Sequence, residues 1–129
     1  MTTELQMLGW CVALGLAHVF VAAGWATLQR GLKWNAGNRE GIPAPLIGAA
    51  ARADRASRNF LETFPFFAAV VLAVVLAKTQ TAQTALGAQI YFWARLVYLP
   101  VYIVGIPYIR TLVWAASLWG LLQVLYGLF

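Results

Sequence analysis

The chain has 129 residues, of which 62% are hydrophobic and only 10% are charged. A soluble domain carries charge on about a quarter of its residues, so this composition excludes an ordinary water-soluble protein. The formal net charge is +5, and the mean hydropathy of +0.74 indicates that lipid is the main solvent. A single cysteine, Cys11, excludes an internal disulfide and a multi-cysteine metal site. We therefore predict one integral membrane domain over residues 1–129.

Four apolar stretches follow one another along the chain, and each is long enough to cross a bilayer as a helix, which takes about 20 residues. The predicted spans are residues 5–30, 54–77, 82–106 and 109–128. The links after the second and third spans are short, which is typical of antiparallel neighbouring helices. Most of the six tryptophans fall near span ends, where this residue anchors helices at the headgroup level. The expected fold is an all-α, up-down four-helix bundle.

The first link, residues 31–53, is much longer than the others and contains several Gly, Pro and Asn residues, which form turns. Most of the cations lie in it or at its edges, and Arg110, at the last turn, lies on the same side of the membrane. The positive-inside rule then places this loop in the cytoplasm and both termini outside, in the inner membrane if the source is bacterial. A topology signal or an anchor for anionic lipid accounts for Lys33 and Arg39. It does not account for the charges deeper in the second span.

One face of the second span is polar. Spacings of three and four residues, which align side chains on one side of a helix, relate Arg52, Arg55, Asn59, Glu62 and Phe66. Glu62 lies about 15 Å deeper than Arg52, since a helix rises about 1.5 Å per residue, and a carboxylate at that depth needs a partner. On another face, Asp54 and Arg58 are spaced to pair at the helix entry. The role of Arg52 stays open between a ligand contact and a topology signal.

The third span carries a matching polar face. Spacings of four, three and four residues join Tyr91, Arg95, Tyr98 and Tyr102. Arg95 lies about 18 Å from Pro107, at a depth similar to that of Glu62, so we predict an ion pair between Glu62 and Arg95. Together the two faces predict a cationic, hydroxyl-rich cleft that opens to the cytoplasm and suits a small anionic ligand. The alternative is a set of hydrogen bonds that only hold helices or subunits together.

His18 is the only histidine and lies in the middle of the first span. No second histidine or cysteine stands at a metal-ligand spacing from it, so we predict no metal site. A hydrogen bond inside the bundle is its expected role, and a catalytic role is the alternative.

Two stretches resemble the MAPEG family, the membrane-associated proteins of eicosanoid and glutathione metabolism. Residues 52–65, RADRASRNFLETFP, are similar to the family's second-helix pattern R-x-x-x-N-x-x-E-x-x-P. Residues 91–102, YFWARLVYLPVY, followed by YIRT at 108–111, resemble the third helix and the arginine that opens the fourth. Within the family, the chain is similar to the bacterial-type microsomal glutathione transferases.

The resemblance implies a homotrimer that binds glutathione between neighbouring subunits, near the cytoplasmic face. The residues that it implies for glutathione binding are Arg30, Arg55, Asn59, Glu62, Tyr98 and Tyr102. Arg110 would stabilise the glutathione thiolate, and Thr111 beside it would donate a further hydrogen bond. The other partners are then lipids and a hydrophobic electrophile, with no nucleic acid and no metal. The implied activity is that of a glutathione transferase or peroxidase. Because the family includes a member that catalyses nothing, the alternative is a non-catalytic lipid-binding or scaffold protein.

Overall fold

The computed structural model describes residues 1–129 and consists of five helices without a strand. Four of them are long, namely α1 (Thr3–Arg30), α3 (Gly48–Ala77), α4 (Ala82–Val104) and α5 (Pro107–Tyr126), and α2 (Leu32–Ala36) is short. By length and composition, α1, α3 and α5 can each cross a membrane. The chain is therefore a multi-pass integral membrane protein of the all-α class, as its composition predicts.

The helix bounds differ from the predicted spans chiefly around the first link. The structure begins α3 at Gly48, not at residue 54, and forms α2 inside the predicted loop 31–53. The segment after Gly48 is rich in alanine, the strongest helix former, so its charged residues are part of the helix. The polar face of α4 lowers its hydropathy, and α4 is not among the helices that composition marks as spans. A fourth crossing therefore stays a prediction.

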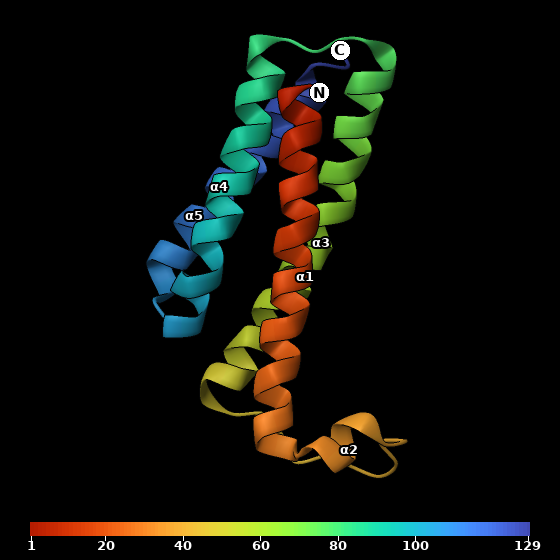
Figure 1. Ribbon diagram of the computed structural model, residues 1–129. Helices are drawn as coiled ribbons and strands as arrows, with labels where there is room; N and C mark the ends of the chain where they lie inside the picture. Colours follow the sequence, from red (N-terminus) through yellow and green to blue (C-terminus); the bar gives the residue numbers. More distant parts are fainter.

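Figure 1 shows the long helices side by side, with α1 packed against α3 and α4, and α5 packed against α4 and α3. Both termini lie at one end of this bundle, while α2 and the irregular segment 37–47 lie at the other end. α1 and α3 extend past the turn between α4 and α5, because they are 28 and 30 residues long against 23 and 20. The bundle is thus closely packed at the terminal end and stepped at the end that carries α2.

The largest apolar core joins α1, α3, α4 and α5, and its fully buried members include Phe67, Val71 and Val124. At the terminal end, α4 and α5 touch through two glycines. A Cβ atom on Gly120 would lie 2.6 Å from the carbonyl oxygen of Gly87, so no larger residue fits without moving a backbone. Glycines at a crossing let membrane helices approach this closely. The terminal end is therefore held by direct backbone-to-backbone packing.

The turn between α4 and α5 begins the stepped end. Gly105 ends α4 with a φ of 90°, a left-handed conformation that favours glycine, and Pro107 occupies the first turn of α5, where its missing N–H is not needed. The Nε of Arg52 donates a 2.6 Å hydrogen bond to the carbonyl of Ile103, close to the C-terminus of α4. Arg52, whose role the sequence leaves open, therefore caps α4 within this chain.

Candidate functional site

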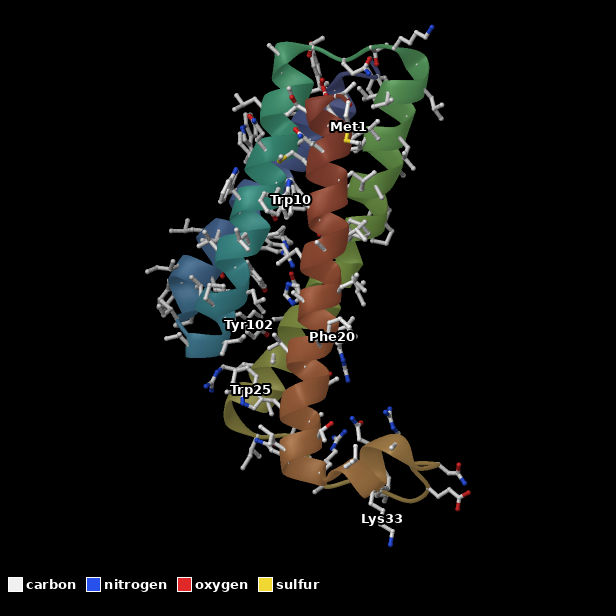
Figure 2. The ribbon with its side chains drawn as sticks, in the orientation of Figure 1. Met1, Trp10, Phe20, Trp25, Lys33 and Tyr102 are labelled. Atoms are coloured by element: carbon white, nitrogen blue, oxygen red, sulfur yellow. The ribbon has the colours of Figure 1, made fainter.

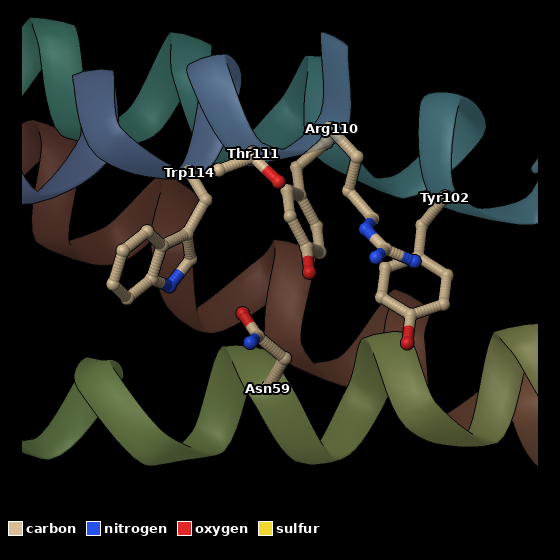
Figure 3. A pocket seen from close by; sticks show the side chains of 6 residues that line it. Asn59, Tyr102, Arg110, Thr111 and Trp114 are labelled. Carbon is tan, nitrogen blue, oxygen red and sulfur yellow. The ribbon is translucent and has the colours of Figure 1, made fainter. Parts of the chain in front are cut away.

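A pocket of about 210 Å³ lies where α3, α4 and α5 meet, at the stepped end of the bundle. Figure 3 shows its lining side chains, which come from all three helices: Asn59 from α3, Tyr98 and Tyr102 from α4, and Arg110, Thr111 and Trp114 from α5. The pocket therefore gathers five of the residues that the sequence predicts for glutathione binding or thiolate activation. It is open on one side and contains no carboxylate among its lining residues.

Arg110 lies in the first turn of α5 and is half-buried. Its guanidinium carbon lies 4.6 Å from the centre of the Tyr102 ring, a cation–π contact that holds the side chain over α4. The only salt bridge in the chain joins Asp54 and Arg58, so Arg110 has no carboxylate partner. The N-terminal end of α5 adds further positive potential. A pocket with this cation attracts an anion.

Asn59 is held in one orientation by Arg95. The Nη1 of Arg95 donates a 2.9 Å hydrogen bond to Oδ1 of Asn59, so the amide nitrogen of Asn59 keeps both of its N–H donors for the pocket. The hydroxyl of Tyr102 accepts a 3.2 Å hydrogen bond from Nε of Arg55, which leaves its own proton free to donate. With the hydroxyls of Tyr98 and Thr111, the pocket offers several hydrogen-bond donors at once. This arrangement suits a ligand that carries negative charge.

The predicted ion pair between Glu62 and Arg95 is not formed within the chain. Arg95 is 0% exposed; its guanidinium bonds to Asn59 and lies 4.3 Å from the centre of the Tyr98 ring. Glu62 is exposed and makes no salt bridge. The spacing of residues along a helix shows which side chains share a face, but not whether that face points to the core. In α3 the core face passes through alanines and phenylalanines, among them Ala53, Ala56, Phe60 and Phe67.

The interpretation of Arg55, Asn59 and Glu62 as one inward face therefore needs correction. Asn59 lies at the edge of the buried face and reaches the pocket, and Arg55 is exposed but contacts the hydroxyl of Tyr102 beside it. Glu62 is exposed and has no salt bridge within the chain. The predicted surface pair of Asp54 and Arg58 is confirmed, with Nη2 and Oδ2 3.0 Å apart. Of this polar face, Glu62 alone thus lies on the surface without a partner from α4.

Arg30 lies outside this pocket. It ends α1, and its Nε donates a 2.9 Å hydrogen bond to the carbonyl of Ala44 in the segment that follows α2. Within one chain the structure does not bring Arg30 together with Arg110, since Arg30 lines two other cavities at the end of α1. A role for Arg30 beside the pocket requires a second copy of the chain.

Trp114 is a pocket residue that sequence analysis missed, because most of the tryptophans were interpreted as membrane anchors. The signal was available: Trp114 stands four residues after Arg110 and three after Thr111, on the same face of α5. The expected hydrogen bond of His18 is also wrong. Both ring nitrogens lack a partner, and the ring stacks on Phe60 with 5.0 Å between centres. No group of His, Cys, Asp and Glu side chains in the chain is arranged to hold a metal ion.

These features define a class: a helical, multi-pass membrane protein with a donor-lined, cationic pocket between three helices. A sequence model of the MAPEG family matches residues 7–129, so the chain belongs to the MAPEG family. Membership makes it a membrane protein related to glutathione and eicosanoid metabolism, in a family that typically uses glutathione. Neither a search of curated proteins nor a search of solved structures returns a match.

Proposed function

We propose that this protein is a membrane glutathione transferase or peroxidase, which binds glutathione at the Arg110 pocket and activates its thiol for attack on hydrophobic electrophiles. The observation that carries the proposal is the meeting of Arg110, Asn59 and two tyrosines around one pocket that lacks a carboxylate. Glutathione brings two carboxylates and a thiol that becomes an anion. Its negative groups therefore match the donors that the pocket presents.

Arg110 is the group proposed to activate the thiol. A free thiol has a pKa of about 8.5, and only the thiolate attacks electrophiles. Lowering that pKa by about two units takes about 2.7 kcal/mol of preferential stabilisation of the anion, which a nearby guanidinium in a partly dry site can supply. Thr111 follows Arg110 in the first turn of α5 and lines the same pocket, so its hydroxyl is the second proposed donor. No nucleophile from the protein is then needed.

The proposed reaction draws its second substrate from the bilayer. The thiol proton leaves to water, the sulfur of the thiolate forms a bond to an electrophilic carbon, and the leaving group departs with its electron pair. Arg110 remains protonated throughout, because arginine is not deprotonated in proteins. An electrophile dissolved in lipid would reach the pocket from the bilayer, since Leu112, which follows the pocket residues Arg110 and Thr111, is an exposed apolar side chain.

We further propose that the working unit is a homotrimer with glutathione bound between neighbouring copies. The pocket of about 210 Å³ is smaller than the roughly 300 Å³ from which small-molecule sites usually start, so one chain accommodates only part of the tripeptide. Arg55 and Glu62 lie exposed beside it on α3, and a carboxylate facing lipid at that depth is unfavourable by at least a few kcal/mol. A neighbouring copy would cover them, with Glu62 available to the ammonium of glutathione and the neighbour's Arg30 to a carboxylate.

The proposed topology follows the charges. Most Lys and Arg residues lie at the end of the bundle that carries α2, and the termini lie at the other end. The positive-inside rule puts the α2 end in the cytoplasm, where glutathione is abundant in its reduced form, and both termini on the non-cytoplasmic side. In a bacterium this membrane is the inner one.

The test is a titration of the purified protein in nanodiscs with glutathione, in which heat and the ultraviolet absorbance of the thiolate are followed together. We expect saturable heat and a parallel rise in thiolate absorbance. S-methylglutathione is the matched control, because it keeps the carboxylates but has no ionisable thiol, and it should give heat without absorbance. If millimolar glutathione gives neither signal, the proposal is wrong, and a non-catalytic lipid-binding or scaffold protein of the same fold becomes the better interpretation.

A further inference from the structure

A second, larger pocket lies at the end of α1, well apart in the chain from the residues around Arg110. Its volume is about 570 Å³, and its lining includes Arg30, Lys33, Trp34, Arg39 and Glu40. A smaller pocket of about 200 Å³ adjoins it, since the two share Arg30 and Trp34, and adds the apolar side chains of Ile42 and Pro43. One half of the combined site is therefore cationic and the other half is largely apolar.

The cationic half has more positive than negative charge, and its cations are unpaired. It contains three cations and one carboxylate, Glu40, yet no salt bridge forms among them, because the only salt bridge in the chain is on α3. Lys33 and Arg39 are exposed. Figure 2 shows Lys33 directed away from the bundle. Unpaired cations that line one cavity suit an anionic group.

Arg39 is fixed in place before any ligand arrives. Its Nε and Nη2 donate hydrogen bonds of 3.0 and 2.8 Å to the backbone carbonyl of Asn35, and Nη2 also reaches Oδ1 of Asn35 at 2.9 Å. The amide of Asn35 donates in turn to Thr27 on α1, over 2.7 Å. Arg39 has a φ of 55°, a left-handed conformation that is uncommon for a residue with a side chain. The fork of hydrogen bonds holds this strained residue and leaves Nη1 available for a ligand.

The rest of the segment after α2 is fixed to the end of α1 by hydrogen bonds. The side chain of Gln29 pairs with the backbone of Ile47 in both directions, at 2.9 and 3.1 Å. Arg30 adds the bond to the carbonyl of Ala44. The pocket is thus preformed, so a ligand does not have to supply the entropy of ordering the loop.

The position of the pocket and its apolar side chains indicate which anion it binds. Figure 1 shows α2 and its loop projecting sideways from the end of α1, away from α4 and α5. Arg30 ends α1, which is long and apolar enough to cross a membrane, so in a bilayer this loop would lie at the level of the lipid headgroups. Ile42 is 98% exposed and Leu32 is 69% exposed, and apolar side chains at this level pack against acyl chains. A free phosphate ion has no apolar part that could pack against Ile42 and Leu32.

We propose that this pocket binds the phosphate headgroup of an anionic membrane lipid. Lys33 and the free Nη1 of Arg39 would contact the phosphate oxygens, while Ile42 and Leu32 would contact the upper part of the acyl chains. The inference does not depend on glutathione chemistry, because Lys33, Arg39 and Ile42 have no part in the Arg110 pocket.

The test measures lipid retention on the full-length protein. The wild type and the K33Q/R39Q variant are extracted from vesicles of phosphatidylcholine mixed with phosphatidylglycerol, and the retained lipid is identified by native mass spectrometry. We expect selective retention of phosphatidylglycerol by the wild type and a loss of about 25-fold in the variant, since each cation near an anionic membrane contributes about fivefold. K78Q, which removes a cation at the opposite end of the bundle, is the charge control and should retain lipid normally.

Two further arms separate the sources of phosphate. Inorganic phosphate in excess should not displace the lipid, and I42S should weaken lipid retention although it changes no charge. If inorganic phosphate competes and I42S behaves like the wild type, the pocket takes a soluble phosphate and the lipid proposal is wrong. Equal lipid retention by K33Q/R39Q and the wild type overturns it as well. Should the glutathione titration of K33Q/R39Q fail while its elution volume on size exclusion is normal, the pocket belongs to the thiol site instead.

Discussion

The two ends of the α4–α5 hairpin differ in how the helices are packed and in which side chains lie between them. At the terminal end Gly87 and Gly120 bring the backbones into direct contact, and apolar side chains fill the surrounding core. At the other end the buried apolar cluster is small, with Ala56, Tyr98 and Tyr102, and a polar pocket opens beside it. Both ends use the same two helices. The comparison teaches that one pair of helices packs backbone to backbone at one end and presents the tyrosines and the arginine of a polar pocket at the other.

The exposed polar residues of α3 lie only in the half of the helix at the stepped end. Arg55 and Glu62 lie on the surface there, whereas the terminal half of α3, from Phe67 to Ala77, has no charged residue. In a bilayer an exposed carboxylate needs a polar neighbour. In the proposed trimer, the stepped end is therefore the part of the molecule that a neighbouring copy would cover.

The largest expected effect on activity comes from removing Arg110, the cation of the pocket at the stepped end. Arg110→Ala should lower kcat/KM for glutathione conjugation by about 100- to 1000-fold, the loss typical when one donor to a developing anion is removed. The thiolate absorbance on glutathione binding should disappear with it. Arg110→Lys is the matched control, and we expect intermediate activity. Full activity of Arg110→Ala in nanodiscs would contradict the proposed mechanism.

The glycine contact at the terminal end is tested by Gly120→Ala. The added Cβ would lie 2.6 Å from the carbonyl oxygen of Gly87 and 2.7 Å from the backbone nitrogen of Tyr91, so α4 and α5 must separate. We expect a loss of about 1–3 kcal/mol in the free energy of unfolding, measured by denaturation in mixed micelles. Gly9→Ala, where a Cβ meets nothing within 4 Å, should be neutral or slightly stabilising. Equal stability of the two variants would show that the glycine contact is not needed.

Arg95 lies between the two ends, and its replacement should separate binding from stability. Two of its buried guanidinium nitrogens have no partner, so Arg95→Met relieves an unfavourable burial while it leaves Oδ1 of Asn59 unpaired. These effects oppose each other, and we expect little change in stability. The Asn59 amide becomes free to turn its oxygen toward the ligand, which should weaken glutathione binding about tenfold by calorimetry. Arg95→Lys, whose ammonium can still donate to Oδ1 of Asn59, should lose less affinity. Unchanged affinity in Arg95→Met would argue against this positioning role.

The smallest effect is expected at the surface pair of α3. Asp54→Asn breaks the salt bridge to Arg58, whose side chain is 76% exposed. Exposed pairs four residues apart contribute about 0.3–0.5 kcal/mol, so both the unfolding free energy and the activity should stay close to those of the wild type. A large loss of activity would place Asp54 in the site, contrary to the structure.

The course of the main chain was largely predictable from sequence, since long apolar runs broken by short polar links have few alternatives in a membrane. The predicted start of α3 was wrong, because the stretch after Gly48 contains both charges and several alanines. The charges favoured a loop in the prediction, whereas the alanines favour a helix. The spacing of polar residues on two helices predicted a polar cleft, and Arg110 entered the predicted site through the resemblance of YIRT to the start of the family's fourth helix. Trp114 was missed because a tryptophan near a helix end has two plausible roles.

The sequence by itself determined that the chain is a helical membrane protein and which polar side chains share a face of α3 and of α4. Composition and periodicity are local properties, so they carry that information without any contact between helices. Only the tertiary structure decided which way each face points: Arg95 inward to Asn59, Glu62 outward to the surface, and Arg30 to a separate pocket. The rotation of a helix about its axis depends on packing against its neighbours, here on alanines in α3 and glycines in α4 and α5, and spacing along one helix does not report it.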